Sequence, residues 1–253
     1  MYKTLKLESK GGITTLTLNV PEKRNAQTPE LTREFPLAIE EINNDPDVKL
    51  VIITGSGKAF CAGGDLQMLE DKLDQPPEQN RREMLAFYKA YLSVLTLDVP
   101  CIAAINGFAI GAGLSFALGC DIRIAAEEAK LGFTFLNLGL HPGMGTTYLL
   151  PQLIGTAHAA ELVFTGKLIT AEEGCRMGLV NKTVPLKDLM DTVMETASLI
   201  AVKPASALRM TKKAMVKYKL RYLEEALDYE ANAQMLGYAS QEMRDLINSY
   251  KAK

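Results

Sequence analysis

Two glycine-rich segments of this chain could hold backbone N–H groups against a reacting group. One is KAFCAGGDL at residues 58–66, and the other lies within residues 99–120, a stretch with no charged side chain. The glycines of that stretch are Gly107, Gly111, Gly113 and Gly119. Glycine costs more conformational entropy on folding than any other residue, so several in one apolar run imply positive φ or the close approach of another group. The chemistry this suggests is a reactive group held against bare N–H donors.

Other interpretations of the uncharged stretch fit less well. About 20 apolar residues can span a bilayer, but the glycines divide this run into a strand-like piece, Cys101–Ile105, and a helix-like piece from about Gly113 to Leu118. A dinucleotide fingerprint would need a third glycine. Gly113-Leu-Ser115-Phe-Ala117 approaches the nucleophile elbow of serine hydrolases. The two histidines, His141 and His158, follow too soon to complete a triad.

Composition points to a globular protein with a large core and a neutral surface. The 253 residues are 47% hydrophobic, which is ample for one large domain or two small ones. A net charge of -2 gives no electrostatic footprint for nucleic acid or for a membrane, so neither is expected as a partner. Four cysteines without paired short spacing predict reduced thiols, with no disulfide and no metal site. The N-terminus lacks an apolar targeting segment, which predicts a cytoplasmic location.

The pattern of elements predicts a mainly parallel, layered α/β core. A hairpin is expected around Gly11-Gly12, Thr28 is placed to cap a helix that starts at Pro29, and Leu50–Thr54 is predicted to be a buried strand. Strands joined by helical crossovers imply right-handed connections. From Leu186 onward the pattern predicts three helices without an obvious core of their own, which pack on the first part of the chain or on a neighbour.

Three segments, in this order and at this spacing, resemble the crotonase superfamily of enoyl-CoA hydratases and isomerases. They are PEKRNAQ at 21–27, KAFCAGGDL at 58–66 and INGFAIGAGLSFALGCDIRIAA at 105–126. The resemblance implies a right-handed spiral of ββα units with the acyl-CoA site over residues 1–190. It also implies a C-terminal helical oligomerisation region over 191–253, forming a trimer or a dimer of trimers. Coenzyme A would enter as part of the substrate, with no separate cofactor.

The resemblance also implies an oxyanion hole. Its two backbone N–H donors map to Ala62 and Ala112, with Gly113 beside the second. Reactions next to a thioester pass through an enolate, so fixed donors favour the transition state, and losing one costs about 3 kcal/mol. The coenzyme A contacts carried over in the same way are Lys23, Arg24, Ala26, Gly64, Asp65 and Leu66. Asp65 fits equally well as a helix cap.

The sequence departs from the family at the acid positions. Hydratases use two glutamates, and here those positions hold Ser115 and Phe135; the aspartate of some diene isomerases is Gly143. Neither serine nor phenylalanine can transfer a proton near neutral pH. His141 could replace the acids or could serve its own loop, and Asn137 could orient a water or stabilise that loop. Four further polar side chains fall in the segment that covers the pocket in relatives: Glu70, Glu83, Tyr88 and Tyr91.

The sequence therefore predicts an acyl-CoA-processing enzyme of the hydratase and isomerase family that stabilises a thioester enolate. Ordinary hydration is in doubt because both glutamates are missing. A decarboxylase of malonyl-type thioesters is one alternative. A non-catalytic relative that binds coenzyme A or RNA is the other.

Overall fold

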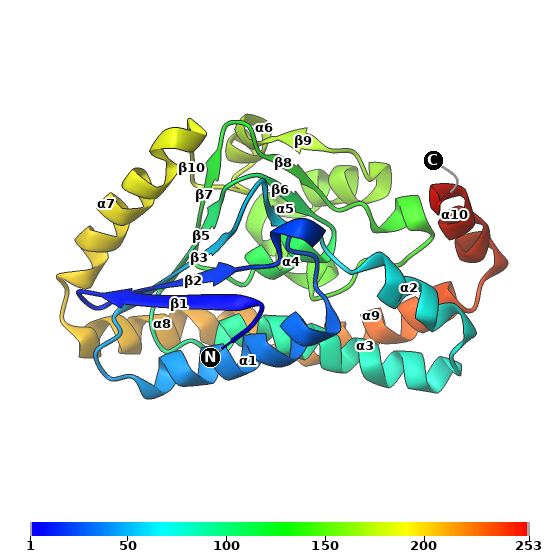
Figure 1. Ribbon diagram of the computed structural model, residues 1–253, viewed down its shortest axis with the longest axis horizontal. Coiled ribbons are helices and arrows are strands. Elements are labelled where there is room, and N and C mark those ends of the chain that lie inside the picture. Colours follow the sequence, from blue (N-terminus) through cyan, green and yellow to red (C-terminus); the bar gives the residue numbers. More distant parts are fainter. Residues whose placement is uncertain (1, 252–253) are drawn as a thin grey trace.

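The strands of this chain form two sheets that lie side by side (Figure 1). A computed structural model describes residues 2–251, apart from the side chains of Leu66, Tyr250 and Lys251. The larger sheet has the spatial order β1 (Leu5–Lys10), β2 (Ile13–Leu18), β3 (Leu50–Gly55), β5 (Cys101–Ile105), β7 (Ile122–Ala126) and β10 (Lys182–Val184). The smaller sheet has the order β4 (Ala59–Cys61), β6 (Phe108–Ile110), β8 (Lys130–Gly132) and β9 (Ile169–Thr170).

The chain alternates between the two sheets as it advances. β3, β5 and β7 are parallel neighbours in the larger sheet, and each is followed directly by a strand of the smaller sheet, β4, β6 or β8. Helices follow these pairs: α2 (Leu66–Asp71) and α3 (Pro77–Leu92), then α4 (Ala112–Ala117), then α5 (Thr146–Thr165). Repetition of this unit makes a spiral of ββα turns, which confirms the crotonase-like α/β fold expected from the sequence.

Local sequence signals account for several elements at the start of the chain. Gly11 and Gly12 have φ of 60° and 81°, which is the left-handed geometry that a tight hairpin turn needs. Thr28 Oγ1 accepts a hydrogen bond from the Leu31 N–H at 3.2 Å, and Pro29 opens α1 (Pro29–Asn44) as predicted. Thr170 and Glu173 form the reciprocal hydrogen bonds of a capping box at the start of α6 (Ala171–Arg176).

The C-terminal helices pack on the spiral. α7 (Leu189–Ala201) lies against β3, β5 and β7, and α9 (Leu223–Tyr238) runs along α3. Between and after them come α8 (Ala205–Leu220) and α10 (Gln241–Lys251). The structure has four helices here among the described residues, not the three predicted, because the chain breaks at Tyr222, whose φ of -126° is not helical. Buried side chains of α7, α9 and α10 belong to the same hydrophobic core as the strands.

No helix in residues 2–251 has both the length and the apolar character that crossing a membrane requires. The four cysteines are free thiols, and three of them, Cys61, Cys101 and Cys120, are buried.

Candidate functional site

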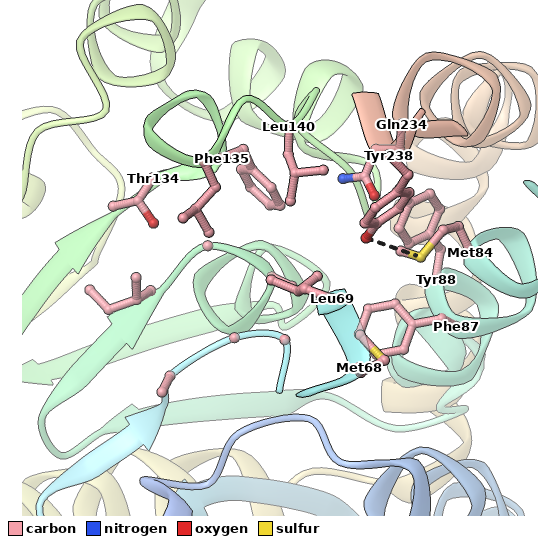
Figure 2. Close-up of a pocket in the computed structure, with 17 residues that line it drawn as sticks. Met68, Leu69, Met84, Phe87, Tyr88, Thr134, Phe135, Leu140, Gln234 and Tyr238 are labelled. Atoms are coloured by element: carbon pink, nitrogen blue, oxygen red, sulfur yellow. Dashed lines mark hydrogen bonds between the residues drawn. The ribbon is translucent and has the colours of Figure 1, made fainter. Parts of the chain in front are cut away.

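A mainly apolar cavity opens between the two glycine-rich segments and the helices α3 and α9 (Figure 2). Its volume is about 540 Å³ including the open mouth. The lining residues are Ala62, Gly63, Gly64, Met68, Leu69, Met84, Phe87, Tyr88, Ile110, Gly111, Ala112, Thr134, Phe135, Leu138, Leu140, Gln234 and Tyr238. The resemblance to the crotonase superfamily predicts that the two glycine-rich segments contribute to one site. In the structure, residues of both segments line this cavity.

Aromatic packing holds α4 in this wall. Phe116 stacks on Phe60 with ring centroids 5.4 Å apart, and Phe35 meets it edge-on at 5.5 Å. Gly113 lets α4 approach the first segment, because a Cβ there would overlap the backbone carbonyl of Cys61. Gly113 is not among the described cavity-lining residues, and its contact with Cys61 makes it a close-packing position beside Ala112.

The N–H group of Ala62, the predicted donor, has a partner within the protein. This N–H already donates to the Arg24 carbonyl at 3.1 Å. The carbonyl is turned toward Ala62 by two successive left-handed residues, Arg24 and Asn25, with φ of 53° and 54°. Asn25 is fully buried and its side chain binds the Val20, Ser56 and Ala59 backbone, which holds this turn in place.

In the cavity wall, the N–H groups of Gly64 and of Ala112, the first residue of α4, donate to no acceptor among the described residues. The two loops touch at this point: a Cβ on Gly63 would come within 3.4 Å of the Ala112 nitrogen. The Gly64 and Ala112 N–H groups therefore belong to two loops that are in contact in the cavity wall.

The three positions at which relatives carry an acidic residue, Ser115, Phe135 and Gly143, have different environments in this structure. Ser115 is fully buried, with Oγ 2.9 Å from the Gly111 carbonyl and 2.6 Å from Thr146 Oγ1, and it does not line the cavity. Phe135 does line the cavity, as an apolar wall. At Gly143 a Cβ would overlap the Tyr88 hydroxyl, so the tyrosine fills the space that an aspartate would need.

His141 serves its own loop in this structure. Its Nδ1 lies 2.6 Å from the Pro142 carbonyl, its ring packs edge-on against Tyr229, and it is absent from the described cavity lining. Burial lowers the pKa of His141 below its usual 6.5, so the ring is neutral at pH 7 and Nδ1–H is the donor. Asn137 likewise donates to the Gly166 carbonyl at 3.0 Å, and His158 is exposed on α5. For both His141 and Asn137, the geometry therefore favours the role of stabilising a loop over a role in proton transfer or in orienting a water.

Of the residues expected near coenzyme A, only Gly64 is among the described cavity-lining residues. Asp65 Oδ1 accepts from the Gln67 N–H at 3.0 Å and caps α2, as its alternative interpretation predicted. Its other oxygen receives the Lys23 ammonium at 2.8 Å, which ties Lys23 to the segment that contains Gly64. Arg24 is exposed and Ala26 is buried. The side chain of Leu66 lies outside the described part of the structure.

Sequence reasoning missed most of the polar residues of the cavity. Gln234 and Tyr238 come from α9, more than a hundred residues after the glycine segments, and no motif marks them. Tyr88 was a candidate that the sequence could not place, and it lies in the cavity; Tyr91 lies outside it, in the core. Glu83 pairs with Lys72 at 2.8 Å and does not line the cavity. Among the described side chains, no Asp, Glu, His, Lys or Arg lines it.

A buried carboxylate, Glu230 of α9, supports the loop behind the cavity. It accepts hydrogen bonds from the Gly145 N–H at 2.7 Å and from the Thr147 N–H and hydroxyl at 2.9 and 2.6 Å. Burial raises the pKa of Glu230 from 4.5 to about 7, against the three donors, which favour the charged form. Glu230 therefore binds its proton more tightly in the folded than in the unfolded protein.

This shift predicts a pH dependence of stability. Below pH ~4.5 Glu230 is protonated in both states, and stability is lost as the pH rises through the folded pKa near 7, in total by about 3 kcal/mol. Urea unfolding at several pH values between ~5 and ~8 measures it. The Glu230→Gln variant should show a flatter profile than the wild type, whereas the exposed Glu225→Gln on the same helix should not. Parallel profiles for all three proteins would contradict the assignment.

Comparison with known proteins agrees with the fold. The family model for enoyl-CoA hydratase/isomerase matches residues 8–253. Crotonyl-CoA hydratase of Syntrophomonas wolfei is 35% identical over 254 residues, covering 100% of this chain and 96% of its own. The 1,2-epoxyphenylacetyl-CoA isomerase of Escherichia coli is 34% identical, covering 96% and 93%. The crystal structure of enoyl-CoA hydratase from Bacillus halodurans superposes with a TM-score of 0.91 at 27% identity, covering 98% and 100%. The chain therefore belongs to the enoyl-CoA hydratase/isomerase family.

Proposed function

We propose that this enzyme binds an acyl-CoA thioester in the cavity and stabilises its enolate with the N–H groups of Gly64 and Ala112. The carbonyl oxygen of a thioester becomes nearly fully charged in the enolate, so two fixed donors in an apolar cavity stabilise the transition state more than the ground state. The observation that carries the proposal is the unused pair of donors where the two loops touch. The names of the hydratase and the isomerase relatives, each of which acts on a CoA thioester, support it.

The cavity lining favours a reaction that needs no base from the protein. Hydration and isomerisation both need a group that accepts a proton near neutral pH. The ionisable groups in the described lining are Tyr88 and Tyr238, and burial raises both pKa values well above 10. Loss of CO₂ from a malonyl-type thioester needs no such base, because the electron pair of the breaking C–C bond moves directly into the enolate. A proton from water then gives the acyl-CoA product.

Turnover on a small panel of thioesters tests this proposal. The purified enzyme is given crotonyl-CoA, malonyl-CoA and methylmalonyl-CoA, and products are followed by chromatography and by release of CO₂. We expect CO₂ and the matching acyl-CoA from a malonyl-type substrate, with hydration of crotonyl-CoA at least 10²-fold slower, since general acid–base catalysis contributes about 10²–10⁴-fold. Fast hydration would contradict the decarboxylase assignment. Binding without any product would support a non-catalytic relative instead.

The position of Lys23 suits contact with the coenzyme A phosphates. Its ammonium is held beside the Gly64 segment by Asp65, and about half of its side chain remains exposed. Arg24 is exposed on the next residue and can bind phosphate in a bidentate manner. We assign these two side chains to the nucleotide end of the ligand. Loss of affinity for coenzyme A in the Arg24→Ala variant would support that assignment.

The C-terminal helices carry an apolar surface that fits self-association. Met210, Met215 and Tyr218 of α8 are 68, 65 and 75% exposed. Exposed apolar patches of this kind mark interaction sites. We assign this surface to the contact between subunits of a homotrimer. Light scattering coupled to size-exclusion chromatography measures the molar mass in solution, and we expect the mass of three chains. The mass of a single chain would contradict the assignment.

A further inference from the structure

The peptide group that carries one of the proposed donors receives a side-chain hydroxyl on its opposite side. The Ala112 N–H and the Gly111 carbonyl belong to the same peptide group, which is trans. In a trans peptide these two bonds point in opposite directions, so the groups that bind the Gly111 oxygen also fix the direction of the Ala112 N–H. That oxygen accepts from the N–H groups of Leu114 and Ser115, at 3.1 and 3.0 Å, and Ser115 Oγ lies 2.9 Å from it.

The peptide group of the other proposed donor is held by the backbone. The Gly64 N–H shares its peptide group with the Gly63 carbonyl, which accepts from the Gln27 N–H at 2.7 Å. Among the described contacts, the Ala112 peptide therefore differs from the Gly64 peptide in receiving a side-chain hydroxyl. A substitution can remove that hydroxyl without changing the backbone.

Ser115 belongs to a short buried chain of oxygen atoms. Ser115 and Thr146 are both 0% exposed, and their hydroxyl oxygens are 2.6 Å apart. Thr146 Oγ1 in turn lies 2.6 Å from the Gly143 carbonyl, so the two hydroxyls connect the carbonyls of Gly111 and Gly143. A carbonyl can only accept, and the short contact between the hydroxyls needs a hydrogen atom of its own. Two hydrogen atoms must therefore serve three contacts.

This shortage allows two arrangements of the hydrogen atoms. In the first, Thr146 donates to Ser115 and Ser115 donates to the Gly111 carbonyl. In the second, Ser115 donates to Thr146 and Thr146 donates to the Gly143 carbonyl. Negative charge on a group bound to the Ala112 N–H polarises that peptide and makes its carbonyl oxygen a stronger acceptor. Such charge therefore favours the first arrangement.

We propose that Ser115 is a positioning residue, whose hydroxyl donates to the Gly111 carbonyl and so strengthens the Ala112 N–H as a donor to the enolate. This inference rests on the proposed function and gives a role to the residue found where hydratases carry a glutamate. The enolate oxygen carries more negative charge than the thioester oxygen, so the hydroxyl should act on kcat more than on KM.

The expected size of the effect follows from two general magnitudes. A cooperative hydrogen bond strengthens its neighbour by about 10–30%, and one oxyanion donor contributes about 10²–10³-fold to the rate. Together these predict that the Ser115 hydroxyl contributes about 2- to 8-fold to kcat.

Two variants, each of which removes one hydroxyl of the pair, test this role. Ser115→Ala should lower kcat by about 2- to 8-fold on the substrate found with the thioester panel, with KM nearly unchanged. Thr146→Val is the matched control, because it removes an equally buried hydroxyl and leaves Ser115 the Gly111 carbonyl as its acceptor. It should keep the kcat of the wild type, although both variants should lose stability. Equal kcat values for the two variants would overturn the proposal.

A double variant shows whether Ser115 acts through the Ala112 N–H. That N–H is absent in Ala112→Pro, so adding Ser115→Ala to this variant should lower kcat no further. A further loss as large as that in the wild-type background would mean that Ser115 acts by another route, which would also overturn the proposal.

Infrared spectra of a bound thioester separate this inference from the proposed function. Butyryl-CoA labelled with ¹³C at the thioester carbonyl has no carboxylate to lose, and hydrogen bonds to that carbonyl lower its stretching frequency. Binding to the wild type or to Thr146→Val should lower the frequency equally, and binding to Ser115→Ala should lower it less. Equal shifts in all three proteins would overturn the role of Ser115 and leave the proposed function intact. No shift in the wild type, or no binding, would overturn both.

Discussion

Replacing Ala112 with proline will lower kcat/KM for the acyl-CoA substrate by about 10²–10³-fold, the usual cost of losing one oxyanion donor. The substitution removes the N–H group and little else. Ala112 is the first residue of α4, where proline is well tolerated because its N–H has no partner within the helix. The preceding residue, Gly111, has no Cβ to clash with the proline ring. Steady-state kinetics on the substrate identified by the thioester panel measures the effect.

Two further variants separate the loss of a donor from a loss of structure. Ala112→Gly keeps the N–H and should retain activity within a few fold. Ala62→Pro removes an N–H that is bonded to Arg24, so it should mainly lower stability. The proposed donor pair fails if folded Ala112→Pro turns over its substrate as fast as the wild type.

Replacing Lys212 with methionine will destabilise the protein by about 3–5 kcal/mol, the cost of leaving one charge of a buried ion pair uncompensated. Lys212 Nζ lies 2.6 Å from Asp121 Oδ2, and the two side chains are 3 and 17% exposed. The same oxygen accepts from the Cys101 N–H at 2.8 Å, so the pair joins α8 to the start of β5. Urea unfolding monitored by circular dichroism measures the change.

The neighbouring residue provides the matched control. Lys213 is exposed on the same helix, and Lys213→Met should change stability by no more than about 0.5 kcal/mol. Adding Asp121→Asn to Lys212→Met should recover part of the loss, because the unpaired charge is then removed. Equal stabilities of the Lys212 and Lys213 variants would show that the ion pair contributes nothing.

Much of the fold could be predicted from local patterns. Thr28 with Pro29, Asp65 and the Thr170–Glu173 box each mark a helix start through a side chain that bonds the backbone within three residues. The strand Cys101–Ile105 agrees residue for residue with the prediction. The prediction failed where the signal was weak. β6 was missed because three residues are too short to show a period, and the break at Tyr222 carries no glycine or proline.

The sequence was enough to predict which segments form the site, but not which backbone N–H groups in those segments are free to bind a ligand. The resemblance located both glycine segments of the cavity wall, but it placed the first donor at Ala62. The Arg24 carbonyl takes that N–H, and Arg24 lies 38 residues earlier in the chain. No pattern within residues 58–66 could reveal this bond, since it depends on how a distant turn packs against them.

The sequence by itself determined the family, the two glycine segments and the absence of the usual acids at Ser115, Phe135 and Gly143. Residue identity at a motif position is enough for such conclusions. The tertiary structure alone decided that the Ala62 N–H donates to the Arg24 carbonyl, that Gly113 packs against Cys61, and that the Ser115 side chain is buried outside the cavity lining. The physical reason is that hydrogen-bond satisfaction is a property of all the groups packed around an atom. Those groups come from segments that only folding brings together.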